Sequence, residues 1–217
     1  MHLTTLTFPE INLRQSDGHK LRGYFAETFG QQSDLFHNHQ ADGSTIYRYP
    51  LIQYKVVDKH PMVVGINEGA QLITERFLSI KEIIINDKQH PLQQKNLKSE
   101  TIEIAVHNDL FTYQFITPWL ALNQHNHLQY EKVDEVSKRK LLKKTLTGNL
   151  LTCAGGLGYR LTQQLLVNLV VQPIIINFKN KKMTGFKGSF TTNLWLPHFV
   201  GIGKSSARGF GTIKGQQ

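Results

Sequence analysis

The sequence lacks the residues that disulfide frameworks and thiolate zinc sites require. Cys153 is the only cysteine among 217 residues, which excludes an internal disulfide and a zinc site built from several thiolates. Long apolar runs are also missing. The most apolar segment, 165–178, is interrupted by Asn168, Gln172 and Pro173, so it is too short and too polar to cross a bilayer. The N-terminus lacks a basic region followed by an apolar run, and we therefore expect a cytoplasmic protein with no membrane partner.

Acidic residues are missing from one part of the chain. All 16 Asp and Glu lie in residues 1–135, whereas residues 136–217 hold 13 Lys and Arg and no acid. The whole chain carries a formal charge of +9. A compact region with this excess attracts polyanions, and nucleic acid is the commonest of these. A generally basic surface without a ligand, or one that meets acidic lipid, gives the same pattern.

The first half of the chain alternates between strand and helix patterns. β-Forming residues predict strands at about 2–13, 46–49, 52–57, 62–66 and 80–85. Apolar residues at three- and four-residue spacing predict helices at about 20–30 and 68–77. The resulting order, β-α-β-β-α-β, is that of the ferredoxin-like fold. We expect a first domain over residues 1–106.

A second unit begins near residue 107 and is also mixed α and β. The pattern predicts a strand at 111–115, a long helix at 133–153 that Gly155 and Gly156 end, and strands at 163–179 and 183–196. The helix has a stripe of Leu142, Leu146, Leu150 and Cys153. One face of the last strand carries Phe186, Phe190, Leu194 and Leu196, and the other carries Lys187, Ser189, Thr191 and Asn193. The first face suits a core, and the second suits solvent or a polar ligand.

Glycines surround cationic and hydroxyl side chains near the C-terminus. The segment contains Gly201, Gly203, Lys204, Ser205, Ser206, Arg208, Gly209 and Gly211. Glycines let successive N–H groups turn inward and form an anion-binding concavity, so the segment is suited to hold an RNA backbone. Gly-Lys-Ser is also part of a nucleotide-binding P-loop, but His198 stands where that motif needs glycine and no helix can follow. A tight turn that closes the fold remains the alternative.

Two histidines lie in a polar loop after the first predicted helix. His37 and His39 are one residue apart, and loops lie at the surface. An imidazole titrates near neutral pH, so it can both accept and donate a proton. Metal-free RNA cleavage needs these steps, together with positive groups near the phosphate. Tyr47, Arg48 and Lys55 follow on the next predicted strands and could supply a hydroxyl and cations.

Other interpretations of the histidine loop remain open. A histidine pair at this spacing can ligate zinc, with Asp34 or Asp42 as a third ligand. His125 and His127 repeat the spacing. A pair of surface histidines without a role is the other alternative.

Several segments taken together resemble a known family. They are residues 21–25 (LRGYF), 35–39 (LFHNH), 47–55 (YRYPLIQYK), 64–66 (VGI) with Gly69, 117–123 (TPWLALN), 185–188 (GFKG), and 201–205 with 208–211. This ordered set is similar to the CRISPR-associated repeat-processing (pre-crRNA) endoribonucleases of the RAMP class, in particular their "b" branch. The resemblance covers nearly the whole chain.

The resemblance implies an α+β protein of two tandem ferredoxin-like (RRM-like) domains. The second, residues 107–217, would be less regular and carry the glycine-rich loop. The implied activity is metal-independent cleavage of CRISPR precursor RNA within its repeats, without a cofactor. The implied partners are repeat RNA, crRNA and an interference complex. The oligomeric state stays open, with a homodimer as one alternative.

The resemblance also assigns residues. It implies His39 as the main acid–base residue and His37 as its partner, with Tyr47 and Lys55 nearby. The RNA-positioning residues would be the glycine-rich loop and Lys187. A non-catalytic RNA-binding subunit on the same scaffold is the alternative, because a fold does not fix an activity.

Overall fold

The structure is a computed structural model that describes residues 1–37, 46, 48–178 and 181–216. The chain divides into two units. The first consists of Met1–Glu103 with Ala207–Gly209, and the second of Ile104–Ser206 with Phe210–Gln217. Each unit contains one four-stranded antiparallel sheet. None of the described helices is long and apolar enough to cross a membrane.

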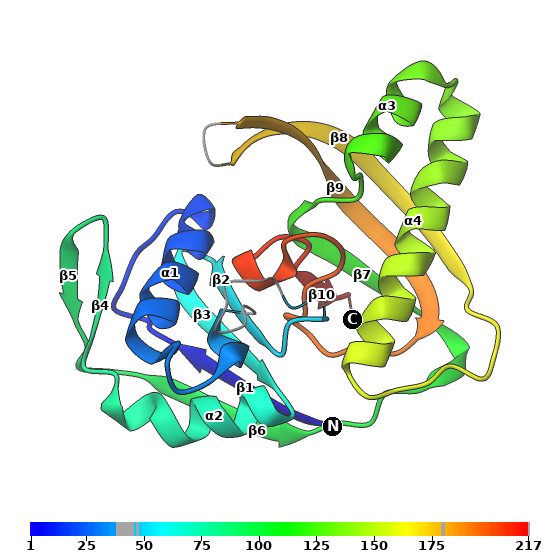
Figure 1. Ribbon diagram of the computed structural model, residues 1–217. Coiled ribbons are helices and arrows are strands. Elements are labelled where there is room, and N and C mark those ends of the chain that lie inside the picture. Colours follow the sequence, from blue (N-terminus) through cyan, green and yellow to red (C-terminus); the bar gives the residue numbers. More distant parts are fainter. Residues whose placement is uncertain (38–45, 47, 179–180, 217) are drawn as a thin grey trace. The chain divides into compact units, whose positions relative to one another are not determined.

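The first unit has the ferredoxin-like strand order. Its sheet runs β2-β3-β1-β6. The strands are β1 (His2–Thr7), β2 (Ile52–Val57), β3 (His60–Ile66) and β6 (Asn96–Thr101). Two helices, α1 (Gly18–Phe29) and α2 (Glu68–Arg76), connect β1 to β2 and β3 to β6, and both lie against the sheet (Figure 1). The β-α-β-β-α-β order that the sequence predicts is therefore confirmed.

Apolar spacing along α1 explains how that helix packs. Leu21 and Phe25 are buried, and the Phe25 ring lies 5.2 Å from the ring of Tyr54 on β2. Each fully buried side chain of this size stabilises the fold by about 1.5–3 kcal/mol. α2 approaches β3 closely because both sides are glycine: a Cβ on Gly65 would lie 2.5 Å from the carbonyl oxygen of Gly69.

Two predictions for the first unit are wrong. The closing strand is β6, whereas the predicted strand 80–85 forms β4 (Glu82–Ile85), which pairs only with β5 (Lys88–Pro91) in a separate hairpin. Asn86 and Asp87, with φ of 53° and 58°, form the tight turn that pairs these two strands. β6 reads NLKSET and is mostly exposed, so no apolar alternation marks it in the sequence.

The predicted strand at 46–49 is also wrong at the positions that the structure describes. Ile46, Arg48 and Tyr49 lie outside any strand. The pairing of β2 with β3 begins at Ile52, after Pro50, which has no N–H to donate to a strand ladder. Three short 3-10 helices complete the unit: η1 (Gln15–Asp17), η2 (Asp34–Phe36) and η3 (Phe77–Ser79).

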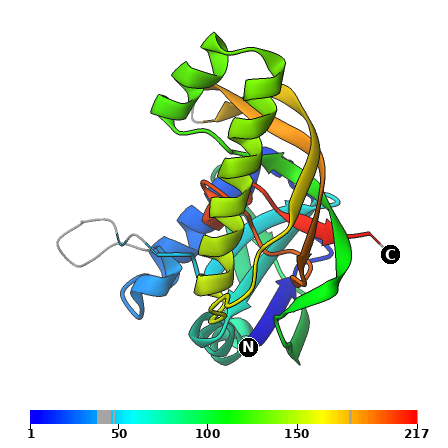
Figure 2. The ribbon, with the colours of Figure 1, turned by 90° about the vertical axis from the view of Figure 1, so that its right-hand side faces the viewer.

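The second unit has the same strand order as the first, but a short 3-10 helix takes the place of its second helix. Its sheet runs β10-β7-β9-β8. The strands are β7 (Val106–Trp119), β8 (Val167–Phe178), β9 (Lys181–Leu194) and β10 (Ile213–Gly215). Between β7 and β8 lie α3 (Gln124–Lys132) and α4 (Glu135–Gly156), and α4 runs along the sheet (Figure 2). Between β9 and β10 the chain forms only the short η4 (Ser206–Arg208) where a regular ferredoxin-like domain has its second helix. The fold class is confirmed, including its less regular second domain.

The predicted core of the second unit is confirmed. The α4 stripe and the apolar face of β9 are buried. The Phe115 and Trp119 rings stack with centroids 5.3 Å apart, and Trp119 also contacts Phe186 at 5.8 Å. Asn193 differs from the prediction, because it is buried instead of facing solvent.

Two element boundaries also differ from prediction in the second unit. The Asn193 side chain accepts a hydrogen bond from Leu166 N at 2.8 Å and donates one to Gln164 O at 3.1 Å. These bonds hold the chain before residue 167, so β8 starts later than predicted. The end of α4 is fixed by Gly158, whose φ of 85° forms the left-handed cap, rather than by Gly155 and Gly156.

Candidate functional site

His37 directly follows η2, the short helix that comes after α1 in the chain. Its N–H donates to Asp34 O at 3.2 Å, and the preceding Phe36 is buried and accepts a hydrogen bond from Tyr54 Oη at 3.1 Å. A Cβ on Gly30 would lie 2.6 Å from Cδ2 of the His37 ring. The imidazole therefore packs where α1 ends, in space that only a glycine leaves free.

Arg22 connects α1 to the histidine. Its Nη2 donates to the carbonyl oxygen of His37. Burial lowers the Arg22 pKa, and the nearby positive charge of Arg208 lowers it further, while Tyr54 acts in the opposite direction. The Arg22 guanidinium thus contacts the histidine segment, and the positive charge of Arg208, whose backbone lies against the first residue of α1, acts on it. A concentration of positive charge of this kind is stabilised by a bound anion.

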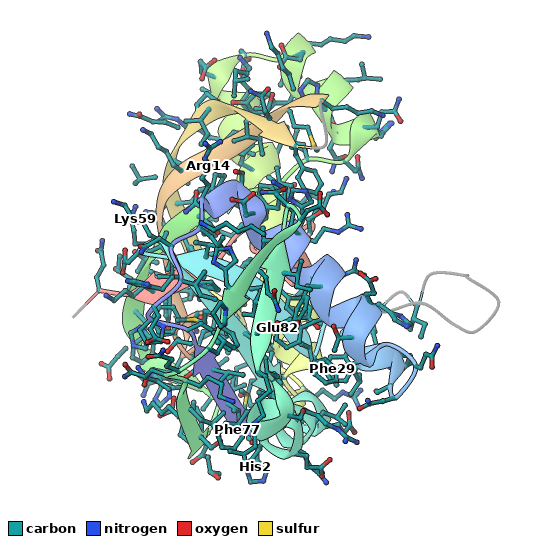
Figure 3. The ribbon with its side chains drawn as sticks, turned by 90° about the vertical axis from the view of Figure 1, so that its left-hand side faces the viewer. His2, Arg14, Phe29, Lys59, Phe77 and Glu82 are labelled. Atoms are coloured by element: carbon teal, nitrogen blue, oxygen red, sulfur yellow. The ribbon has the colours of Figure 1, made fainter. Side chains whose placement is uncertain are left out.

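The tip of the glycine-rich loop, Ala207–Gly209, belongs to the first unit. Gly209 has a φ of 88°, and a Cβ there would lie 2.9 Å from Tyr54 O. A Cβ on Gly18, the first residue of α1, would lie 2.9 Å from Arg208 O. The loop backbone therefore lies on β2 and on the first turn of α1. Figure 3 shows α1 in this unit, with Arg14 before its first turn and Phe29 at its other end.

The rest of the glycine-rich loop packs within the second unit. Gly211 has a φ of 60°, and a Cβ there would overlap the carbonyl oxygen of Ile202. Gly203, with a φ of 86°, packs against the Trp119 indole, which donates to Asn149 Oδ1 at 3.1 Å. The glycines are therefore required for packing, in agreement with the tight-turn alternative. Lys204 is exposed and Ser206 is buried, so the two groups differ in their access to a ligand.

Gly201, Ser205 and Lys187 complete the predicted RNA-positioning set. Gly201 forms an isolated antiparallel β-bridge with Thr212. Ser205 has a φ of 57°, a left-handed conformation that is uncommon for serine. Lys187 is exposed on β9. The structure places Lys187 and Lys204 in the second unit and Arg208 in the first.

Lys55 is fully buried, in contrast to the other predicted cations. It lies on β2, and its Nζ donates to Gln53 Oε1 at 2.8 Å. Gln53 is also buried, and its Nε2 donates to Pro50 O at 3.1 Å. A buried ammonium needs such oxygen partners, because removing it from water is costly.

Some predicted residues lie outside the described part of the chain. These are His39 and Tyr47, together with the proposed third zinc ligand Asp42. The other proposed third ligand, Asp34, pairs with Arg48 at 3.1 Å. His127 Nε2 is 3.1 Å from the hydroxyl of Thr184. Within the described ranges, no three His, Cys, Asp or Glu side chains are grouped as a metal site would require.

Sequence reasoning missed Arg22 as a site residue. The sequence shows only an arginine on a helix, which is usually a solvated side chain. Its hydrogen bond to His37 spans 15 residues and follows from the turn of the chain after α1. The one signal in the sequence is that Arg22 stands in the LRGYF segment that carries the family resemblance.

The two units differ strongly in charge. The first has 12 Lys and Arg and 12 Asp and Glu, whereas the second has 13 Lys and Arg and only 4 acids. The second unit therefore has the field that attracts a polyanion. The first unit has no net charge, because its Lys and Arg equal its Asp and Glu in number.

The fold is thus one of two ferredoxin-like units, the second with a glycine-rich loop before its last strand. Family models of the Cas6b N-terminal domain and the Cas6b C-terminal domain match residues 1–103 and 105–216. The chain belongs to the Cas6b family.

Individual relatives agree with this assignment. A crystal structure of Cas6b is similar with a TM-score of 0.92 and 35% identity, covering 98% of this chain and 97% of that one. A crystal structure described as the CRISPR RNA processing endoribonuclease Cas6b has a TM-score of 0.80 and 31% identity, with both chains covered completely. An uncharacterized protein of Methanocaldococcus jannaschii is 33% identical over 140 residues, which are 64% of this chain and 95% of that protein.

Proposed function

We propose that this protein is a metal-independent endoribonuclease that cleaves CRISPR precursor RNA within its repeats. The proposal rests on family membership, and on a relative with 31% identity over its full length that is described as a CRISPR RNA processing endoribonuclease. The single observation in this chain that carries the proposal is the hydrogen bond from Arg22 to the His37 carbonyl, with the positive charge of Arg208 acting on Arg22. An RNA phosphate is an anion that such a group would hold.

The proposed chemistry needs two proton transfers. A base removes the proton from a ribose 2′-hydroxyl, and the oxygen attacks the adjacent phosphorus. An acid then protonates the 5′-oxygen as its bond to phosphorus breaks. The products are a 2′,3′-cyclic phosphate and a 5′-hydroxyl end. We assign these transfers to His39 and His37, and we propose that the Tyr47 hydroxyl assists them.

The guanidinium groups would act on the phosphate rather than on the protons. Charge develops on the phosphoryl oxygens during attack, and preorganised cations that face this charge stabilise the transition state. Arg22 is held in place by its bond to the His37 carbonyl, so the cation and the histidine segment are positioned together. Lys55 is buried against Gln53, and we propose that it contributes through its charge and by positioning β2.

RNA binding would rely mainly on the basic second unit. We propose that Lys187 and Lys204, which are exposed, contact phosphates, and that Arg208 contributes a third contact. Gly201, Gly203, Gly209 and Gly211 would shape the loop, with Ser205 and Ser206 beside the cations. The protein would act in the cytoplasm as a homodimer and would transfer the crRNA to an interference complex.

Incubation with a repeat RNA in EDTA tests the activity. We expect cleavage in the chelator, a 2′,3′-cyclic phosphate on the product, and no cleavage when the ribose at the cut carries a 2′-deoxy substitution. Cleavage that needs added metal would contradict the metal-independent mechanism. Binding without cleavage, alike in the wild type and in His39→Ala, would instead identify an RNA-binding subunit.

A further inference from the structure

A groove between α3 and α4 is lined by none of the residues assigned above, although Asn149 of its lining lies beside Gly203. It has a volume of about 690 Å³. Its lining includes His125, Asn126, Gln129, Ser137, Lys140 and Lys144. All lining residues belong to the second unit, and α3 lies beside the first turns of α4 (Figure 1).

The lining of the groove is cationic and contains no carboxylate. Lys140 and Lys144 supply the charge, and the amide and hydroxyl side chains supply neutral hydrogen-bonding groups. The acids of α3 and α4 do not line the groove: Asp134 accepts from Ser137 N at 2.7 Å as the cap of α4, and Glu135 pairs with Lys138 at 2.8 Å. The groove lining therefore offers contacts for phosphates and for base edges and contains no carboxylate of its own.

The spacing of the lysines destabilises α4. Lys140 and Lys144 are four residues apart, as are Arg139 and Lys143, and like charges at this spacing destabilise a helix. Among the described residues, no carboxylate lies within ion-pair distance of these four side chains. A polyanionic ligand would remove the repulsion.

The walls of the groove are fixed before any ligand arrives. On α3, Tyr130 is buried with its ring edge-on to Phe186 at 5.6 Å, and His127 Nε2 is 3.1 Å from the hydroxyl of Thr184 on β9. The Lys138 ammonium of α4 lies 5.2 Å from the centre of the Tyr130 ring. A rigid groove loses little conformational entropy on binding.

We propose that this groove is a second RNA-binding site, which takes a single-stranded segment outside the one held at His37. A strand fits because cations that follow the backbone, combined with groups that reach unpaired base edges, are how single-stranded RNA is bound. The choice of RNA as the polyanion rests on the proposed function. An acidic protein segment would use the lysines but would leave the amide groups without base edges to bind.

Gly148 provides a direct test, because it lines the groove and no atom lies within 4 Å of a Cβ added there. We expect Gly148→Glu to weaken the binding of single-stranded oligouridylate about fivefold and Gly148→Lys to strengthen it by a similar factor. Gly148→Ala should keep the affinity and raise the Tm by about 2 °C, since alanine favours helix. Gly155→Glu is the matched control: it lies on the same helix, its Cβ also meets nothing, and it does not line the groove.

The lysines give a second measurement that uses salt dependence. Each phosphate contact to a single strand contributes about 0.7 to the slope of log affinity against log salt, so Lys140→Gln with Lys144→Gln should reduce the slope by about 1.4. Lys81→Gln with Lys98→Gln removes the same charge from the first unit and should leave the slope unchanged. Equal affinities of Gly148→Glu and Gly155→Glu for oligouridylate would overturn the proposal. An unchanged salt slope in the Lys140→Gln, Lys144→Gln variant would overturn it too. Either result is expected if the groove binds an acidic protein segment instead of RNA.

Cleavage separates this site from the proposed active site. With repeat RNA at saturating protein, the Gly148→Glu variant should cut at the wild-type rate, because the groove binds RNA without touching the reacting atoms. If the wild-type protein binds repeat RNA without cutting it, the proposed nuclease activity fails while the groove is still tested by the oligouridylate affinities. A cutting rate at saturation that falls in Gly148→Glu but not in Gly155→Glu would overturn the separation of the two sites.

Discussion

The two ferredoxin-like units share a strand order but differ in charge and in one helix. The first unit is balanced in charge and has both of its helices. The second has 13 Lys and Arg against 4 acids, and a glycine-rich loop with η4 takes the place of its second helix. The same strand order can therefore support different functions when the net charge changes and a loop replaces one helix. We interpret the first unit as the place of the chemistry and the second as the main RNA-binding surface.

The largest expected effect is the loss of cleavage in His39→Ala. Removing a general acid or base slows such reactions by about 10²–10⁴-fold. His107→Ala is the control, because it removes an exposed imidazole from the second unit. Single-turnover cleavage of repeat RNA measures the rate, and filter binding should show the same affinity for all three proteins. Equal rates for the two variants would remove the chemistry from the histidine loop.

Gly211→Ala should destabilise the protein, whereas Gly23→Ala should not. The first glycine is required by the conformation of the loop, and the second is not required by its surroundings. At Gly211 the φ is 60° and a Cβ would clash with Ile202 O, so we expect a loss of about 3 kcal/mol or more in unfolding free energy. At Gly23 on α1 an added Cβ meets nothing, and alanine should stabilise the helix by up to about 1 kcal/mol. Urea unfolding measures both changes. A Gly211→Ala variant as stable as the wild type would show that the loop can relax.

Alkaline pH should destabilise the second unit through Tyr113. Burial raises the pKa of Tyr113 to about 12, and its oxygen accepts a hydrogen bond from Leu196 N at 2.7 Å. The folded state thus prefers the neutral phenol. Its contribution to stability is complete below pH 10, where an unfolded tyrosine is still protonated, and is lost as the pH rises from 10 to 12.

The loss should be on the order of 2 kcal/mol over that window. Tyr113→Phe should be less stable at neutral pH, because Leu196 N loses its acceptor, and should show a flatter pH dependence above pH 10. Burial also raises the pKa of Tyr54 in the first unit, so part of the dependence will remain. An unchanged slope in Tyr113→Phe would assign the whole effect to other groups.

The smallest expected effects separate the two cations of the glycine-rich loop. Lys204→Ala should reduce the salt slope of RNA binding by about 0.7, because it removes one phosphate contact, and should leave the cutting rate at saturation unchanged. Arg208→Ala should reduce the slope similarly and also slow cutting by about tenfold, because Arg208 lies near Arg22. Identical cutting rates for the two variants would show that the loop only binds RNA.

The predictions from sequence succeeded where the type of side chain determines whether a position is buried. The stripe on α4 and the apolar face of β9 were predictable because burial follows from hydrophobic periodicity. They failed where pairing partners decide the outcome. β6 is a polar strand that exists through its register with β1, and β4 leaves the main sheet because its turn pairs it with β5.

The candidate site shows the same limit. The family resemblance and the chemistry of imidazole are sufficient to select His37 as a candidate. Nothing in the local sequence indicates that Arg22 donates to the His37 carbonyl, or that Lys55 on a strand of buried residues has no exposure to solvent. These facts depend on contacts between residues that are distant in sequence.

The sequence by itself determined the family, the order of strands and helices in the first unit, and the excess of positive charge in the last 82 residues, because each follows from residue type and spacing. Only the tertiary structure decided that Ala207–Gly209 lies with the first unit, that Arg22 donates to the His37 carbonyl, and that the groove between α3 and α4 has no acid in its lining. The physical reason is that hydrophobic burial and chain register bring these groups together, and neither is encoded in any single segment.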